Sequence, residues 1–284
     1  MAVVAQPRIT PDIARDGFAI MPGFLGPEAL SRVRREVEAL LQRPLPPGCE
    51  RPHNTLVPLR WADGPVAAVL GRPQCVATLT EASGATDLRW ISAYVSVKPA
   101  RSPPLWWHQD WWCWDHPVSY RRAAAQVAVL CYLSDTTQGT AALRVLPGSH
   151  HRSVDLHSHL PEAHSRQAGE LAESDEALAD HSDQATLTAR AGDAVVLDYR
   201  LLHGTHANRA ATRRDCLLLT FTPAWRDLPD DVRAHLVRHP ALPARGERPS
   251  FPQALIPSYE GTPRDLPLRR NAPARFAASG SSPP

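Results

Sequence analysis

Short strand patterns joined by Gly- and Pro-containing turns, without helices of matching length between them, most constrain the fold of this chain. Residues 88–98 alternate cleanly, with Ile91, Ala93, Val95 and Val97 on one face and polar or aromatic residues on the other. Further strand patterns follow at residues 125–135, 142–150, 193–202 and 215–223. Successive short strands of this kind predict a sandwich or a jelly roll.

The sequence on either side of these strands predicts a helical layer and an irregular tail. Within the first third, the expected elements are a strand at 18–21, an amphipathic helix at 26–43 and one or two short helices within 64–83. The helix at 26–43 places Leu30, Val33 and Val37 on one face and charged residues on the other. We therefore divide the 284 residues into a mainly helical support layer at 1–86, a core at 87–225 and a proline-rich C-terminal extension at 226–284.

Residues 155–190 interrupt the predicted core as a polar insertion without a strand pattern. A connection of this length in a compact domain usually has helices of its own or covers a binding site. Residues 169–180 can supply one helix, and we expect the insertion to form a mobile lid over a pocket. Beyond the core, a further short helix is predicted at 229–238.

Composition and charge exclude several classes of function. The formal net charge of +2 gives no reason to expect a nucleic-acid partner or an acidic membrane surface. No apolar run approaches the length of a membrane span, and the first residues lack the basic and apolar regions of a signal peptide. The five scattered cysteines have no metal-finger spacing. We therefore expect a cytoplasmic protein with reduced thiols, and the sequence leaves its oligomeric state open.

The segment WWHQDWWCW at residues 106–114 places one imidazole and one carboxylate among five of the eight tryptophans. On an extended segment, His108 and Asp110 point the same way because they are two residues apart. They can then bind the same divalent ion, for which His203, at the end of an apolar strand pattern, is the candidate third ligand. Two histidines and one carboxylate on one face of an octahedron form the facial triad of non-haem Fe(II) oxygenases.

Two adjacent arginines after His203 indicate that the site also binds an anionic small molecule. Arg214 comes eleven residues after His203 and enters the next strand pattern, where a guanidinium can hold a dicarboxylate through a bidentate fork. Arg213 competes for this role, but adjacent strand residues face opposite ways, so only one of the two can reach a pocket. The alternative interpretations are a zinc hydrolase with the same three ligands and a jelly-roll binding protein with a non-catalytic metal.

Four ordered segments of the chain resemble the phytanoyl-CoA dioxygenase family, within the Fe(II)/2-oxoglutarate oxygenases. They are residues 16–40, 106–114, 126–150 and 191–214. The resemblance implies a mainly β protein with a double-stranded β-helix core, which is the cupin-like jelly roll, and flanking α-helices. It also implies that residues 1–284 form a single oxygenase domain that oxidises a small-molecule substrate.

The resemblance assigns roles to individual residues. The implied iron ligands are His108, Asp110 and His203. The implied residues at 2-oxoglutarate are Arg214 and Thr205, which take its distal carboxylate, and Gln126 and Trp114, which line its pocket. Arg214, not Arg213, has the spacing of the family. With O2, such an enzyme hydroxylates an unactivated C–H bond and forms succinate and CO2. Halogenating relatives replace the metal carboxylate by a small residue, so Asp110 favours hydroxylation.

For several residues near these motifs, the sequence allows both a role in the site and a purely structural role. Lys98, the only lysine, either faces the site as an ammonium group or ends an exposed strand. His150 and His206 are rival histidines. We expect His206 to be exposed to solvent in a turn and His150 to cap a turn, rather than to bind the metal. The tryptophans of residues 106–114 either exclude water from an apolar pocket or pack the rim of the barrel.

Overall fold

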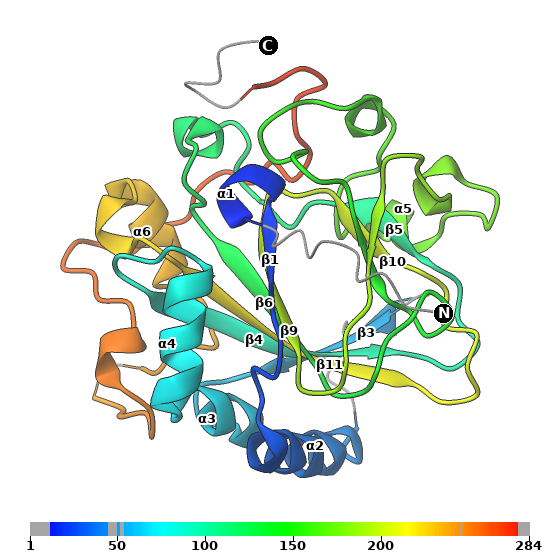
Figure 1. Ribbon diagram of the computed structural model, residues 1–284. Helices are drawn as coiled ribbons and strands as arrows, with labels where there is room; N and C mark the ends of the chain where they lie inside the picture. The colour runs from blue at the N-terminus through cyan, green and yellow to red at the C-terminus, as the bar shows by residue number, and fades with distance from the viewer. Residues whose placement is uncertain (1–11, 45–49, 52–53, 245, 278–284) are drawn as a thin grey trace, which may run out of the picture.

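Two antiparallel sheets form a jelly roll in the computed structural model, which describes residues 12–44, 50–51, 54–244 and 246–277 (Figure 1). The larger sheet contains β1 (Phe18–Met21), β2 (Glu50–Arg51), β3 (Asn54–Leu59), β4 (Arg89–Lys98), β6 (Val127–Tyr132), β9 (Ala194–Asp198) and β11 (Arg214–Thr222), in the order β1-β9-β6-β11-β4-β3-β2. The smaller sheet contains β5 (Leu105–His108), β7 (Leu143–Val145), β8 (Ala185–Leu187) and β10 (His203–Thr205), in the order β5-β10-β7-β8. The predicted double-stranded β-helix is confirmed.

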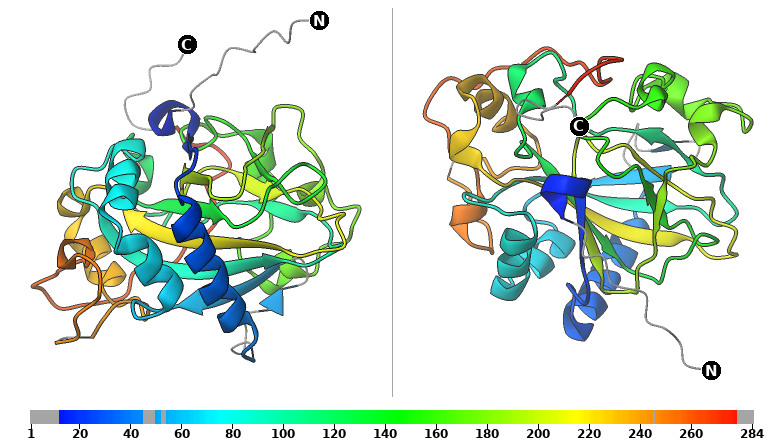
Figure 2. Two further views of the ribbon diagram at one scale, coloured as in Figure 1. Left: turned by 60° about the horizontal axis from the view of Figure 1, so that its bottom comes forward. Right: turned by 45° about the horizontal axis from the view of Figure 1, so that its top comes forward.

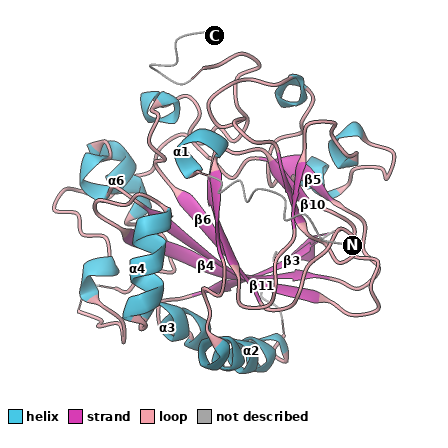
Figure 3. Cartoon of the chain, viewed as in Figure 1, coloured by secondary structure: helices cyan, strands magenta, loops and turns pink. Residues whose placement is uncertain are grey.

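The central strands β6 and β9 of the larger sheet are buried on both faces, which explains why they read as continuous apolar runs. Its inner face packs Leu130 and Leu197 in one core with Val145 and Leu187 of the smaller sheet. Its outer face is covered by α2 (Pro27–Leu41), α3 (Gly64–Leu70) and α4 (Pro73–Ala82), which share a second core with strands β6, β9 and β11 (Figure 3). The helices therefore support the sheet from outside and leave the inner side to the smaller sheet.

The N-terminal elements follow the sequence pattern, with two additions. The strand predicted at 18–21 is β1, after the short helix α1 (Ile13–Asp16), and the helix predicted at 26–43 is α2. The stretch 64–83 forms two helices because α3 ends before Pro73, which begins α4. Strands β2 and β3 were not predicted, and they extend the larger sheet beyond β4.

A β-bulge breaks the alternation predicted for residues 88–98. The pairing of β11 with β4 shifts between Thr220, which faces Ser92, and Phe221, which faces Trp90. Trp90 therefore joins Ala93 and Val95 in the outer core, whereas Ile91 belongs to the inner core. The prediction that Ile91 shares a face with Ala93 and Val95 is wrong, because the extra residue in the strand reverses the direction of every side chain before it.

The insertion at 155–190 contains a strand that the sequence pattern did not indicate. Strand β8 pairs with β7 and belongs to the smaller sheet. The helix expected at 169–180 is replaced by the four-residue α5 (Arg166–Gly169) and the single 3-10 turn η3 (Glu176–Leu178), after an earlier 3-10 turn η2 (Asp155–Ser158). The insertion is therefore part of the jelly roll at its C-terminal end and irregular elsewhere.

The C-terminal extension begins with the predicted helix, observed as α6 (Asp230–Leu236), and then runs irregularly across the molecule (Figure 2). The other short elements are the 3-10 turns η1 (Pro117–Tyr120), η4 (Trp225–Asp227) and η5 (Gln253–Leu255). Near its end, Arg269 N donates to the Trp112 carbonyl at 2.8 Å, so the extension returns to the segment that carries the tryptophans. Among the described residues, no helix has the length and apolar character needed to cross a membrane.

Candidate metal and cosubstrate site

His108 and His203 face each other across two neighbouring strands of the smaller sheet. His108 ends β5, His203 begins β10, and the antiparallel register pairs the two residues directly. The carboxylate of Asp110 lies 3.8 Å from His108 Nε2 and 3.6 Å from His203 Nε2. The candidate ligand atoms of these three side chains all lie within 4.8 Å of one another. The structure therefore brings together the three residues that the sequence indicated for metal binding.

Main-chain hydrogen bonds fix both imidazole rings in the form that a metal ion needs. His108 Nδ1 donates to the Trp106 carbonyl at 2.9 Å, and His203 Nδ1 donates to the Leu201 carbonyl at 3.0 Å. Because a carbonyl only accepts, each Nδ1 carries the proton and each Nε2 offers a lone pair to the site. Burial, reinforced by the neighbouring His203, lowers the pKa of His108 well below its ordinary value, so this ring is neutral.

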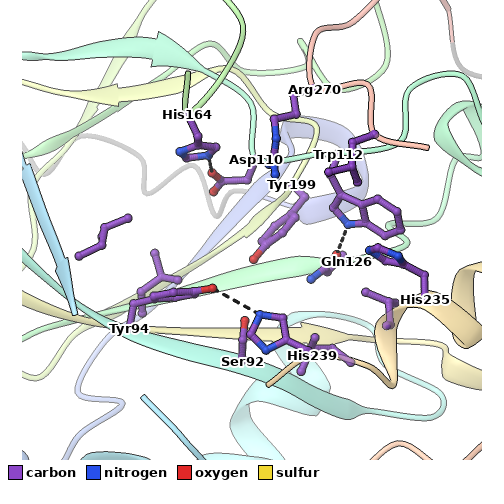
Figure 4. Close-up of a pocket in the computed structure, with 15 residues that line it drawn as sticks. Ser92, Tyr94, Asp110, Trp112, Gln126, His164, Tyr199, His235, His239 and Arg270 are labelled. Atoms are coloured by element: carbon purple, nitrogen blue, oxygen red, sulfur yellow. Dashed lines mark hydrogen bonds and ion pairs between the residues drawn. The ribbon is translucent and has the colours of Figure 1, made fainter. Parts of the chain in front are cut away.

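His164, from the insertion, is a site residue that sequence reasoning missed. Its Nε2 lies 2.8 Å from Asp110 Oδ1 (Figure 4), and its ring meets that of His108 edge-on with the centroids 5.3 Å apart. Burial acts to raise the pKa of Asp110, but the hydrogen bond with His164 and the nearby imidazoles outweigh it and hold this pKa well below its usual range. Asp110 is therefore a carboxylate anion.

Two cationic side chains are buried where β4 and β11 pair. Arg214 and Lys98 are register partners, and their side chains are 5% and 0% exposed. Within the described residues, Arg214 Nε and Lys98 Nζ have no hydrogen-bond partner, and neither does the buried hydroxyl of Thr205. Unpaired buried donors are costly, so this arrangement suits an anionic ligand. Lys98 is thus fully buried, which decides against the exposed strand end.

The two arginines that competed for the pocket point in opposite directions. Arg213 is 42% exposed and forms ion pairs with Asp215, at 3.0 Å, and with Glu38. Arg214, one position later, is buried and lies 5.9 Å above the ring of Tyr132. The strand therefore turns Arg214 inward, which is the register that the sequence analysis favoured.

Burial and nearby positive charge change the chemistry of Lys98. Burial, followed by the charges of Arg214 and Arg144, lowers the pKa of Lys98 to about 7. The amine can therefore lose its proton near neutral pH when no anion is present. An anionic ligand beside Arg214 would favour the charged ammonium again.

A cavity of about 370 Å³ opens beside Asp110 (Figure 4). Gln126 lines it, and its Oε1 accepts a hydrogen bond from Trp112 Nε1 at 2.9 Å. A role of Gln126 at 2-oxoglutarate stays a prediction. Trp114 instead packs against Tyr120 and Phe276. Trp112, and not Trp114, lines this cavity, because β5 ends at His108 and strand alternation no longer sets the direction of the later side chains. That Trp114 lines the 2-oxoglutarate pocket stays a prediction.

The sequence model of the phytanoyl-CoA dioxygenase (PhyH) family matches residues 13–216, which is most of the chain. The chain belongs to this family. Together with the convergence of His108, Asp110 and His203, this membership makes it a non-haem iron, 2-oxoglutarate-dependent dioxygenase that uses Fe(II), 2-oxoglutarate and O2.

A dioxygenase and a hydroxylase of known activity match most of this chain, and a solved structure shares its fold. Ectoine dioxygenase of Nocardia farcinica is 25% identical over 253 residues, which cover 83% of this chain and 84% of that protein. L-proline trans-4-hydroxylase of Streptomyces griseoviridis is 27% identical over 255 residues, covering 84% and 92%. HygX of Streptomyces hygroscopicus, solved with nickel, 2-oxoglutarate and hygromycin B, has the same fold, with a TM-score of 0.54, 22% identity and coverage of 74% of this chain and 84% of that one.

The tryptophans of this dioxygenase divide between the cavity and the insertion. Trp112 lines the cavity. Trp106 packs against Leu178 of the insertion, and Trp107 Nε1 donates to the Ala179 carbonyl at 2.9 Å. Trp111 Nε1 donates to Ser119 Oγ at 2.8 Å. Most of these rings therefore attach neighbouring segments to the barrel, and one of them borders the ligand space.

The rival polar residues take structural positions in the family fold. His206 is buried and bonded to Thr186 Oγ1 at 2.8 Å, so the expectation of an exposed turn is wrong although His206 stays outside the metal cluster. His150 is likewise buried, against His151. Asn208 fixes its own turn, since its amide donates to the Thr212 and Pro99 carbonyls, both at 2.9 Å.

Proposed function

We propose that this dioxygenase hydroxylates an unactivated C–H bond of a small-molecule substrate and releases succinate and CO2. The observation that carries the proposal is a His-Asp-His cluster in the same barrel as two buried basic side chains, Lys98 and Arg214, for which the described residues provide no counter-ion. The first suits Fe(II), and the second suits the free carboxylate of a dicarboxylic cosubstrate. We also propose that residues 1–284 form one oxygenase domain, since the C-terminal extension borders the cavity.

In this proposal His108, Asp110 and His203 hold the iron. The neutral Nε2 atoms of the two histidines and the anionic carboxylate form the donor set that non-haem Fe(II) favours. His164 occupies Asp110 Oδ1, which leaves Oδ2 for the metal. When bound, iron and 2-oxoglutarate supply the oxidising chemistry with O2, and the protein supplies position and a dry environment.

The distal carboxylate of 2-oxoglutarate is assigned to Arg214, Thr205 and Lys98. Each has a buried donor atom without a partner among the described residues, and the carboxylate would satisfy these atoms together. A zinc hydrolase with the same ligands would leave this cation pair without a function. Asp110 supports hydroxylation over halogenation, because its carboxylate would bind the metal where a halogenating enzyme needs space for a halide.

The surroundings of the cavity fit an oxidation that must exclude water. Trp112 and Tyr199 border it, and burial raises the pKa of Tyr199 well above its ordinary value, so its phenol stays neutral. We further propose a cytoplasmic location, supported by buried free thiols at Cys75, Cys113 and Cys131. Cys49 lies outside the described residues.

The test is anaerobic loading of the protein with Fe(II) and 2-oxoglutarate. We expect the weak visible charge-transfer band of an iron–2-keto-acid chelate, and, after addition of O2, succinate in an amount that rises with the right substrate. The Asp110→Ala variant should lose the band and the hydroxylated product. Tight zinc binding by the wild-type protein, with neither a band nor succinate, would overturn the proposal in favour of a hydrolase.

A further inference from the structure

The C-terminal extension forms one wall of the cavity beside Asp110 (Figure 4). It contributes His235, Leu236, His239, Leu268 and Arg270. The backbone at this wall is fixed, since Arg269 N donates to the Trp112 carbonyl at 2.8 Å and Trp114 N donates to the Arg269 carbonyl at 3.1 Å. These hydrogen bonds fix the backbone position from which the side chain of Arg270 extends.

Arg270 points into the cavity. Figure 4 shows its side chain between Asp110 and Trp112, above Tyr199. It is half-buried, and within the part of the chain that the structure describes it forms no hydrogen bond or ion pair. Its neighbour Arg269 pairs with Asp115 at 2.5 Å, away from the cavity. A guanidinium that faces a cavity and has no partner among the described residues suits an anionic group of a ligand.

The other charges around the cavity do not balance Arg270. Of the described residues that line it, Asp110 is the only acid and Arg270 the only arginine or lysine. Asp110 already interacts with His164 and is assigned to the iron. Burial lowers the pKa of His239 to about 4, so this ring adds no positive charge. The ligand space thus faces one unbalanced positive charge.

We propose that the substrate carries a carboxylate, which Arg270 holds through two parallel hydrogen bonds while the carbon body lies toward the metal site. This proposal rests on the proposed function and names its substrate class. One guanidinium balances one negative charge, which matches a monocarboxylate better than a phosphate ester with nearly two charges. The volume of about 370 Å³ suits a molecule of metabolite size, and Ile91, Tyr94 and Trp112 provide walls for its carbon skeleton.

The test uses pairs of ligands that differ only in the charge of one group. Aliphatic, alicyclic and aromatic carboxylic acids, each with its primary amide and with phosphate monoesters of similar size, are titrated calorimetrically into anaerobic protein loaded with Fe(II) and 2-oxoglutarate. We expect at least one acid to bind more tightly than its amide, and to increase succinate release when O2 is admitted. A panel in which no acid binds better than its amide overturns the proposal, as does a preference for the phosphate esters.

Variants at two adjacent arginines locate the effect. Arg270→Gln should raise the Kd of the best acid at least ~10-fold and leave the weak binding of its amide unchanged, because only the charge-assisted fork is lost. Arg270→Lys should recover part of the affinity. Arg269→Gln is the matched control, since Arg269 pairs with Asp115 on the other side, and it should bind the acid like wild type.

The same titrations separate this proposal from the proposed function. If wild-type protein fails to bind 2-oxoglutarate, the oxygenase assignment fails first. If Arg270→Gln weakens 2-oxoglutarate binding and not acid binding, Arg270 belongs to the cosubstrate and the substrate proposal is wrong. If both titrations behave as in wild type, Arg270 has no role in recognising a carboxylate.

Discussion

Arg213 and Arg214 are adjacent in sequence, yet only Arg214 is buried with an unpartnered Nε. Removing a buried charge partner typically costs about 3–5 kcal/mol, so Arg214→Ala should raise the KM for 2-oxoglutarate at least ~100-fold. Iron affinity should survive, because the three ligands are intact. Arg213→Ala is the matched control, and its KM should equal that of wild type. Loss of 2-oxoglutarate affinity in the control alone would mean that the strand faces the other way.

The lowered pKa of Lys98 leads us to expect that the affinity for 2-oxoglutarate depends on pH. Its pKa is about 7 in the free protein, and a bound carboxylate raises it, so binding above pH 7 takes up a proton. Affinity should be constant well below pH 7 and fall as pH rises above it, by at most about tenfold per pH unit. Calorimetry in buffers of different ionisation enthalpy measures the proton uptake. Lys98→Met should bind more weakly and with no proton uptake; an unchanged pH profile in this variant would exclude Lys98 as the origin.

In the ligand-free protein, Lys98 should also make the free energy of unfolding depend on pH. Lys98 has an ordinary pKa of 10.5 when unfolded and about 7 when folded, so the unfolded chain binds more protons between these values. Its contribution therefore makes the free energy of unfolding rise with pH across this window and fall as pH drops toward 7. Chemical denaturation of wild type and Lys98→Met at pH 7 and pH 9 checks the sign, and the variant should show the smaller rise.

Sequence patterns identified the metal cluster at the residue level because each ligand lies in or next to a strand. His108 and Asp110 share a direction two residues apart, and Arg214 follows strand alternation. Trp112 and Trp114 could not be distinguished in this way, because they follow the end of β5. His164 and Arg270 lie in irregular segments without periodicity, so only the folded chain shows that they reach Asp110 or the cavity.

Among the elements, strands with a clear apolar pattern were predictable, whereas β2, β3, β8 and the bulge in β4 were not. Strands β4, β6, β9 and β11 each carry enough apolar residues to show their period. Strand β8 has three residues, which is too few for a pattern to emerge from a polar insertion. The bulge between β4 and β11 depends on pairing between residues far apart in sequence, so alternation within residues 88–98 alone gives no sign of it.

Arg144 attaches the insertion to the smaller sheet, and its removal should release the insertion. It is fully buried, donates to the carbonyls of Leu105 and Leu178 at 3.0 Å and of Ala179 at 2.7 Å, and lies 4.5 Å above the ring of Trp107. The Arg144→Met variant leaves these carbonyls without a hydrogen-bond donor, and each unsatisfied buried group lowers the free energy of unfolding by about 1–3 kcal/mol. Limited proteolysis should then cut within residues 155–183 faster than in wild type, while the core resists.

Arg166→Met serves as the control for that experiment, since Arg166 is an exposed residue of the same insertion that pairs only with Glu170. Equal cleavage of the two variants would show that Arg144 does not attach the segment. The mobile lid stays a prediction. Because Arg144 and the tryptophans hold the end of the insertion, we expect any ligand-dependent protection to concentrate around His164, and proteolysis with and without 2-oxoglutarate and substrate measures it.

At the scale of the whole molecule, metal binding should stabilise the fold through its three ligands. A ligand present at 100 times its Kd adds about 2.7 kcal/mol to the free energy of unfolding, which raises the Tm by several degrees in a chain of this size. Anaerobic thermal unfolding with and without Fe(II) should show this rise in wild type. Asp110→Ala should lose most of it, and Asp115→Ala, which changes an exposed carboxylate nearby, should retain it. The same rise in both variants would place the metal elsewhere.

Because His108 pairs directly with His203, iron binding depends on the correct pairing of strands β5 and β10. The two ligands come from distant parts of the chain and meet only when β10 has inserted between β5 and β7. A register error of one residue would send one imidazole to the opposite face of the sheet. A barrel in which β10 has paired in the wrong register would therefore lack the complete ligand set, so bound iron marks molecules in which β10 has paired correctly with β5.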